Sequence, residues 1–226
     1  MSDISERFCE DFCQELAGSK DTSFSRTYDG EPASRIIAVS NNLTLMADLS
    51  PLSIGHLLLV SNYHYYSYAE VCRDHLDEVG RVTDQVLTLY SSTFGDPVIL
   101  EHGSSPDASG GSSCISHAHW HFLPVSAERI SGVMTEDGLK HTNLESLGEL
   151  AQTARRLVPY LYVASASHRS VFSIDRLIRR QYLRSVVGTI LGIPDPIWDW
   201  AIVAKKQYLR SSMRATTDWC FNNRID

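Results

Sequence analysis

Short apolar runs separated by polar residues predict three strands in the first third of the chain. Residues 35–39 and 43–48 are two such runs, and the polar Ser40-Asn41-Asn42 between them is typical of a hairpin turn. Residues 55–60 form a third run after a loop that contains Pro51. Before these strands, the pattern predicts a helix over residues 5–16, followed by a loop to about Pro32.

Residues 68–90 predict a long amphipathic helix. Their apolar positions recur at helical spacing, at Val71, Cys72, Leu76, Val79, Val82, Val86, Leu87 and Leu89. Gly95-Asp96-Pro97 would end this helix, and residues 98–102 predict another strand. A Ser- and Gly-rich loop over residues 104–113 then leads to a run of alternating histidines.

The pattern changes after Pro124, where residues 143–157 and 173–191 predict helices and residues 160–164 a strand. We therefore divide the chain into residues 1–34, residues 35–125, and a C-terminal α/β extension over residues 126–226. Trp198, Trp200 and Trp219 would pack this extension onto the core. Hairpin-connected strands with a single crossover helix predict an α+β fold with an antiparallel sheet.

The composition is that of a soluble globular protein, with 43% hydrophobic and 21% charged residues among 226. A net charge of -7 argues against a partner that is a nucleic-acid polymer, because neutralising phosphates needs a broad basic surface. An apolar run that could span a membrane is absent, and the first residues lack a signal-peptide pattern, so we expect a cytoplasmic protein. Five cysteines, an odd number, do not suggest a disulfide framework.

His117, His119 and His121 alternate with the apolar Ala118, Trp120 and Phe122. On a strand, this alternation places the three imidazoles on one face and the apolar side chains on the other. A chance cluster on a surface strand is one interpretation. A metal site and histidine-centred covalent catalysis are the two functional ones, because imidazole serves as ligand, nucleophile or proton donor near neutral pH.

The segment His117–Leu123 resembles the signature His-φ-His-φ-His-φ-φ (φ, apolar) of the histidine-triad (HIT) superfamily. Residues 50–60, which include His56, resemble the second landmark of that superfamily, and Glu101-His102-Gly103 stands where it has a strand and turn. The order and spacing agree over residues 35–124. The resemblance implies a HIT-like fold in which a long crossover helix packs on an antiparallel sheet.

The resemblance also implies an activity. His119 would attack the α-phosphorus of a nucleotide and form a covalent nucleotidyl-histidine, which water would release as a nucleoside monophosphate. His121 and His56 would donate to phosphate oxygens or to the leaving group, and His117 would position the site. The substrates expected are phosphoramidates, dinucleoside polyphosphates or other nucleotide conjugates, with a purine base. The chemistry itself would need no cofactor.

Two alternatives stay open beside hydrolysis. One is a nucleotidyltransferase or phosphorylase with an acceptor other than water, and the other is a nucleotide-binding regulatory module with weak catalysis. The transferase branches that resemble galactose-1-phosphate uridylyltransferase usually carry glutamine at the third triad position. His121 at that position favours the hydrolase branches.

Further positions match the nucleotide-binding residues of the superfamily. Asp48 corresponds to an acidic residue that binds the ribose hydroxyls, although a turn residue at a strand end is the alternative. Ser112, Ser113 and Cys114 correspond to the loop that approaches the phosphate, with cysteine where serine is common. Glu101 likewise stands where asparagine is frequent. Gln181 and Arg184 resemble a C-terminal segment of longer HIT proteins that approaches the phosphates.

Some bacterial relatives bind structural zinc, and the corresponding residues here are Cys9, Cys13, His64 and His117. Three residues separate the two cysteines instead of two, but positions i and i+4 of a helix still face the same side. Two cysteines packed inward on the first helix are the alternative. Family members also form two-fold dimers through their sheet and helix, so we expect a homodimer unless the extension covers that contact.

Overall fold

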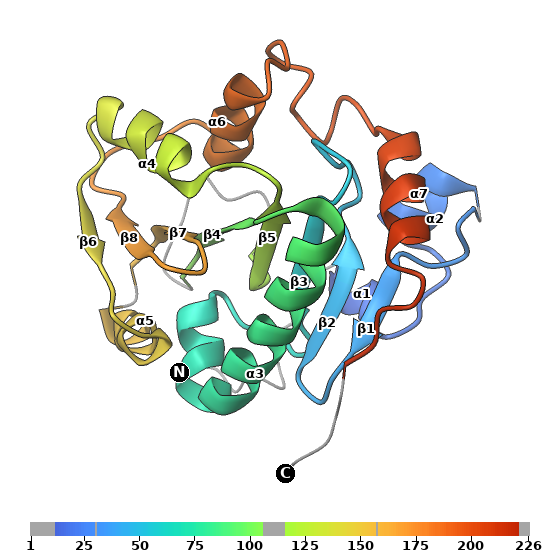
Figure 1. The fold of residues 1–226 in the computed structure, drawn as a ribbon, viewed down its shortest axis with the longest axis horizontal. Coiled ribbons are helices and arrows are strands. Elements are labelled where there is room, and N and C mark those ends of the chain that lie inside the picture. The colour runs from blue at the N-terminus through green and yellow to red at the C-terminus, as the bar shows by residue number, and fades with distance from the viewer. Residues whose placement is uncertain (1–11, 30, 106–115, 157, 222–226) are drawn as a thin grey trace.

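The computed structural model describes residues 12–29, 31–105, 116–156 and 158–221. Its strands are β1 (Ile36–Val39), β2 (Leu43–Ala47), β3 (Leu57–Ser61), β4 (Val98–Gly103), β5 (His119–Leu123), β6 (His141–Asn143), β7 (Tyr160–Ala164) and β8 (Arg169–Ser173). They form one antiparallel eight-stranded sheet in the order β1-β2-β3-β5-β4-β7-β8-β6 (Figure 1). The predicted fold class, an antiparallel HIT-like sheet with a long crossover helix, is confirmed.

The helices are α1 (Phe12–Leu16), α2 (Ser23–Tyr28), α3 (Tyr68–Phe94), α4 (Ala127–Glu136), α5 (Leu147–Thr153), α6 (Tyr182–Ile190) and α7 (Lys206–Ala215). A 3-10 turn, Ala154–Arg156, follows α5. None of the helices in these described segments is both long and apolar enough to cross a membrane.

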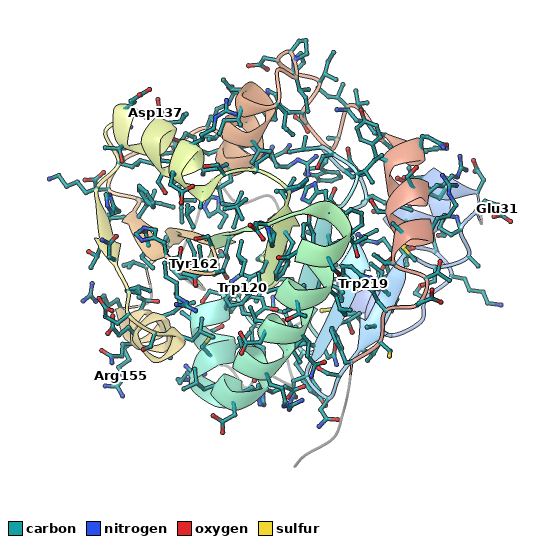
Figure 2. All side chains as sticks on the ribbon, in the orientation of Figure 1. Glu31, Trp120, Asp137, Arg155, Tyr162 and Trp219 are labelled. Atoms are coloured by element: carbon teal, nitrogen blue, oxygen red, sulfur yellow. The ribbon has the colours of Figure 1, made fainter. Side chains whose placement is uncertain are left out.

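The two larger apolar cores lie on opposite faces of the sheet. Trp120, Phe122 and Tyr162 belong to the core under α3 and α5, and the Trp120 and Tyr162 rings stack 5.6 Å apart (Figure 2). Leu100 and Leu123, whose side chains point the other way, belong to the core under α4 and α6. Because successive side chains of a strand alternate between faces, His119 and His121 lie on the face opposite Trp120.

The C-terminal extension continues the sheet of the preceding residues. β7 pairs with β4 in antiparallel register, from Ile99 opposite Ala164 to Gly103 opposite Tyr160. α5 packs against α3 on the same side. These two contacts cover the sheet edge and the helix through which the resemblance implied a homodimer, so dimerisation stays a prediction that would need another surface. The division at residue 125 also stays a prediction, since the sheet crosses it without interruption.

Two stretches differ from the prediction made from the sequence. The loop expected before Pro32 contains α2, because Thr22 and Ser25 form a reciprocal capping box and Phe24 and Tyr28 are buried beneath it. Between residues 173 and 191 the predicted helix is wrong in its first half: Ser173 ends β8, which pairs with β7, and α6 begins at Tyr182. Strand pairing there outweighed a local capping signal.

The predicted helix over residues 143–157 is shorter than expected, since Asn143 belongs to β6 and α5 begins at Leu147, after the cap Ser146. The predicted strand over residues 160–164 is confirmed as β7. Of the predicted first helix, only α1 lies within the described residues. Trp198 and Trp219 are buried, as the expected packing of the extension requires.

Candidate histidine site

The three alternating histidines lie at the start of the central strand β5. The strand begins at His119, so the expectation of all three histidines on the strand is wrong by two residues. His117 occupies a bend just before it, where the ring Nε2–H donates 2.7 Å to the carbonyl oxygen of Ser61. His117 is almost fully buried, and burial lowers its pKa to about 3. It therefore anchors the entry to the strand.

His119 has its ring fixed by the preceding backbone. Its Nδ1–H donates a 2.6 Å hydrogen bond to the carbonyl oxygen of His117, which leaves the lone pair on Nε2. Burial lowers the pKa of His119, against the opposing effect of this hydrogen bond, so the imidazole is neutral near pH 7. The Phe12 ring of α1 packs 5.3 Å from it and the His121 ring 4.8 Å from it.

His56 and His121 form a hydrogen-bonded pair whose tautomers follow from their partners. The backbone N–H of Leu52 donates to His56 Nδ1 at 3.2 Å, so His56 carries its proton on Nε2. That Nε2–H donates to His121 Nδ1 at 2.9 Å, and His121 therefore carries its own proton on Nε2. Burial lowers the pKa of His56 to about 4 and that of His121 well below its usual value. Both rings are neutral at pH 7.

Asp48 directly follows β2 and lies beside this pair. Its Oδ1 accepts from the backbone N–H of Ser50 at 2.8 Å and from Arg184 Nη1 at 3.3 Å. Its Oδ2 lies 3.7 Å from His56 Nε2 and 4.0 Å from His121 Nδ1. Burial alone would raise the pKa of Asp48, but the nearby His56 and Arg184 lower it well below its usual range. The expected ribose ligand is thus a buried anion engaged by the protein.

Arg184 and Gln181, the expected phosphate ligands from the extension, both contact protein groups. Arg184 donates from Nη2 to the carbonyl oxygen of Ser50 at 2.6 Å and from Nε to that of Trp198 at 3.1 Å. Gln181 donates from Nε2 to Asp199 at 2.6 Å and accepts from the backbone N–H of Trp200. Both side chains therefore tie α6 to the segment over residues 198–200.

Some expected residues lie elsewhere. Ser112, Ser113, Cys114 and Cys9 are outside the described residues. Glu101, which stands where asparagine is frequent, points to the opposite face of the sheet from His121 and is buried beneath α3. It receives hydrogen bonds from the backbone N–H of Tyr68, the Tyr160 hydroxyl and the Trp120 indole.

A second cluster adjoins the first through His117. Cys13 Sγ lies 3.5 Å from Nδ1 of both His64 and His117, and the three ligand atoms are all within 4.8 Å of one another. A thiolate and two imidazole nitrogens are donors that Zn²⁺ prefers. The hydrogen bond from His117 Nε2–H to Ser61 is the outer contact that turns Nδ1 toward the cluster. The described residues therefore fit three positions of the expected zinc set.

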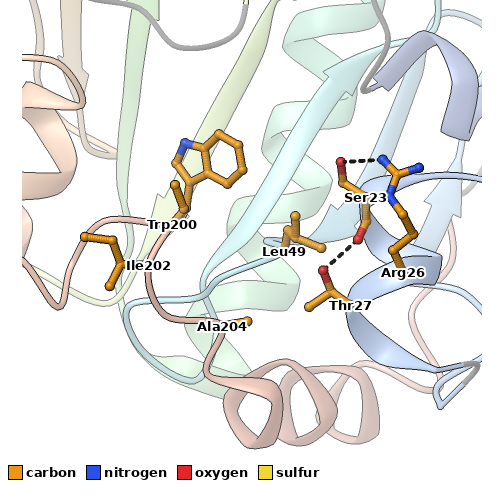
Figure 3. A pocket seen from close by; sticks show the side chains of 8 residues that line it. Ser23, Arg26, Thr27, Leu49, Trp200, Ile202 and Ala204 are labelled. Carbon is orange, nitrogen blue, oxygen red and sulfur yellow. Dashed lines mark hydrogen bonds between the residues drawn. The ribbon is translucent and has the colours of Figure 1, made fainter.

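A cavity of about 290 Å³ lies between α2 and the extension (Figure 3). Its wall includes Leu49, which follows Asp48 in the chain. Trp200 and Ile202 face it from one side, α2 from the other, and Leu49, the residue after Asp48, lies between them. The polar groups of its wall are Ser23, Arg26 and Thr27. Neither this cavity nor the contact of Phe12 with His119 could be predicted from the sequence, since both join segments far apart in the chain.

The fold and this histidine constellation define a protein of the HIT superfamily with a C-terminal extension. Residues 18–136 match the model of the family described as "protein similar to CwfJ C-terminal", and the chain belongs to this HIT-like family. The predicted superfamily is thereby confirmed. No curated protein matches the sequence.

Three solved structures are similar at low identity. A hypothetical histidine-triad nucleotide-binding protein from Sulfolobus tokodaii is 22% identical, with 46% of this chain and 68% of that chain covered and a TM-score of 0.33. A zinc-bound histidine-triad family protein from Mycobacterium smegmatis is 16% identical, with 46% and 73% covered and a TM-score of 0.32. The yeast Ap4A phosphorylase in complex with AMP is 10% identical, with 89% and 84% covered and a TM-score of 0.42.

Proposed function

We propose that this protein is a nucleotide hydrolase that acts through a covalent nucleotide on His119. The observation that carries this proposal is the hydrogen bond from His119 Nδ1–H to the carbonyl oxygen of His117. It fixes the tautomer in which Nε2 is the nucleophilic nitrogen, while the lowered pKa keeps that nitrogen unprotonated at neutral pH. Within the described residues, Nε2 of His119 makes no hydrogen bond that would block attack.

The reaction takes two displacements. The Nε2 lone pair of His119 forms a bond to the α-phosphorus as the P–N or P–O bond to the leaving group breaks, and the leaving group takes up a proton. Water then attacks the same phosphorus and gives up one proton, which balances the proton that the leaving group took up, the bond to Nε2 breaks, and the nucleoside monophosphate departs. Both displacements develop charge on the phosphate oxygens, where a fixed N–H donor has its largest effect.

His121 is the donor that we assign to those oxygens. Its Nδ1 accepts from His56, so its Nε2–H faces away from that pair and is available to the phosphate. His56 is fully buried and acts on the substrate only through His121. This differs from the direct role that the resemblance implied for His56. In the pair, His56 orients His121, and His121 is the member that reaches the substrate.

We assign the nucleobase to the cavity between α2 and Trp200, which Figure 3 depicts. An indole face and the Leu49 and Ile202 side chains suit a planar apolar group, and Arg26 and Ser23 can serve its polar edge. The cavity adjoins Asp48 through Leu49, which supports one substrate that reaches both places. A purine is the base that we expect there.

We also propose that zinc, where bound, is held by Cys13, His64 and His117, with Cys9 as the fourth ligand. The ion would have a structural role because four protein ligands leave it no open position for substrate. His117 would then fix the backbone whose carbonyl oxygen orients His119. This proposal rests on the donor set of the described residues and leaves the nucleotide chemistry to the triad.

The test uses adenosine 5′-phosphoramidate and a diadenosine polyphosphate in buffer without phosphate or another acceptor. We expect AMP release by the wild-type protein, a nucleotidyl adduct on His119 in mass spectra after rapid quenching, and neither with His119→Ala. His141→Ala, which changes an exposed histidine of β6, is the matched control and keeps full activity. Turnover that starts only on addition of phosphate or a second nucleotide would indicate a transferase, and equal activity of His119→Ala would contradict the proposal.

A further inference from the structure

The loop between β2 and β3 carries both Asp48 and His56, and the C-terminal extension holds it at several points. Arg184 Nη2 donates to the carbonyl oxygen of Ser50, and the Ser50 hydroxyl donates to the carbonyl oxygen of Val203. At the other end of the loop, the backbone N–H of Gly55 donates to the Ser212 hydroxyl of α7 at 2.8 Å. The extension therefore determines where two members of the histidine site lie.

Arg184 is the one contact among these that also carries charge. Its guanidinium is buried, and it reaches Ser50, Trp198 and Asp48 from three different nitrogens. Asp48 is a buried anion, and the neighbouring His56 and His121 are neutral at pH 7. Among the described residues, the positive charge at contact distance that compensates Asp48 at that pH is therefore Arg184.

The His56 N–H has two acceptors within reach. Its Nε2 lies 2.9 Å from His121 Nδ1 and 3.7 Å from Asp48 Oδ2. Without its cation, the buried carboxylate would compete with His121 for the His56 N–H, because hydrogen bonds to an ionised acceptor are about twice as strong as neutral ones. If His56 turned its N–H to Asp48, His121 Nδ1 would lose its donor, and His121 could carry its proton on Nδ1 instead. Its Nε2 would then have no proton to donate.

We propose that Arg184 is a positioning residue of the histidine site: by compensating Asp48 it leaves the His56 N–H to His121 and so keeps the His121 proton on Nε2. The assignment of catalytic effect rests on the proposed function, whereas the effect on the tautomer does not. Asp48 is the partner that places the Arg184 charge beside His56 and His121, and Arg184 also holds the β2–β3 loop that carries Asp48 and His56. The extension thus supplies a residue that the site needs, although that residue does not contact the substrate.

The kinetic test compares Arg184→Gln, Arg184→Lys and the control Arg180→Gln with adenosine 5′-phosphoramidate as substrate. Arg180 is exposed and lies four residues before Arg184, so its variant should keep kcat and KM unchanged. We expect kcat of Arg184→Gln to fall about 10- to 100-fold, while KM changes by less than about threefold. A loss of activity of that size is usual when a residue that orients a metal-binding side chain is removed, and we expect the same for one that orients a catalytic side chain. The kcat of Arg184→Lys should lie between those of the wild-type protein and Arg184→Gln, because an ammonium keeps the charge but cannot make all three hydrogen bonds of the guanidinium.

The second test reads the tautomers directly, by long-range ¹H–¹⁵N spectra of histidine at pH 7. We expect His121 with its proton on Nε2 in the wild-type protein, a shift of its signals toward the Nδ1–H form in Arg184→Gln, and recovery in Arg184→Gln/Asp48→Asn, where the competing charge is gone. The double variant also keeps the test usable if Arg184→Gln alone is too unstable to fold. Unchanged His121 signals in folded Arg184→Gln would overturn the proposal, whatever its kcat. If the wild-type protein lacks nucleotide turnover, the proposed function fails, and these spectra still decide the role of Arg184.

Discussion

The Tyr160 hydroxyl donates a 2.7 Å hydrogen bond to Oε2 of Glu101 across the boundary between β7 and β4. Glu101 is buried, and burial raises its pKa to about 7 against the lowering effect of the Tyr68 backbone N–H, 2.6 Å from the carboxylate. The extension therefore supplies one of the hydrogen-bond donors that offset the free-energy cost of burying this carboxyl group in the core. A polar contact at the junction couples the stability of the two parts of the chain.

Replacing Tyr160 by phenylalanine removes this donor and keeps the ring. We expect Tyr160→Phe to lower the free energy of unfolding by about 1–3 kcal/mol, because a buried acceptor loses a partner. Urea titration at pH 8 measures the change. Tyr63→Phe, at an exposed tyrosine, is the control and should leave stability unaltered. A loss in Tyr160→Phe no greater than in this control would contradict the coupling.

Gly103 lies opposite Tyr160 in the same strand pair, and its lack of a side chain makes room for the ring. A Cβ on Gly103 would stand 2.4 Å from Tyr160 Cζ, so the buried ring would have to move. We expect Gly103→Ala to destabilise the protein by about 1–3 kcal/mol. Gly80→Ala, in α3 with nothing within 4 Å of the added Cβ, should instead stabilise it by about 0.5–1 kcal/mol. Thermal unfolding of the two variants side by side checks the sign of each change.

Acid should destabilise the protein through His56. The unfolded chain binds a proton on this residue below pH 6.5, whereas burial lowers the pKa of the folded state to about 4. The unfolded state therefore binds more protons between these values, and stability falls as the pH drops from 6.5 to 4, by about 3 kcal/mol for this group.

His56→Gln removes this proton uptake and should flatten the dependence of unfolding free energy on pH within that window. Glu101 acts in the opposite sense between pH 4.5 and about 7 and is present in both proteins, so its contribution cancels in the difference between wild type and variant. His141→Gln serves as the control for an exposed histidine. Parallel curves for wild type and His56→Gln would refute the assignment.

The cluster of Cys13, His64 and His117 is the proposed zinc site. Purified protein should contain about one equivalent of zinc, and a chelator should lower its Tm. Cys13→Ser should lose the metal and its response to the chelator, whereas Cys220→Ser, at an exposed cysteine, should keep both. Elemental analysis and thermal unfolding measure these outcomes. Wild-type protein with less than about a tenth of an equivalent would end the proposal.

The regular parts of the fold could be predicted from local pattern. The amphipathic run of α3 and the apolar runs of β2, β3, β4 and β7 carry their periodicity within a few residues of one another. The helix expected from Ser173 failed because its first residues pair with β7, a contact that depends on another segment. The residues of the α2 capping box, Thr22 and Ser25, are visible in the sequence, but a helix of six residues is too short to show a helical periodicity.

The sequence by itself determined which side chains are the candidates for chemistry: the alternation of His117, His119 and His121 identified the triad, and its spacing from His56 identified the superfamily. The tertiary structure decided what each group contacts. Arg184 lies 136 residues from Asp48 in the chain, and the Leu52 N–H that fixes the tautomer of His56 depends on the fold of one loop. Charge compensation and tautomer choice act over a few ångströms in space, so they depend on packing between distant segments and not on local spacing.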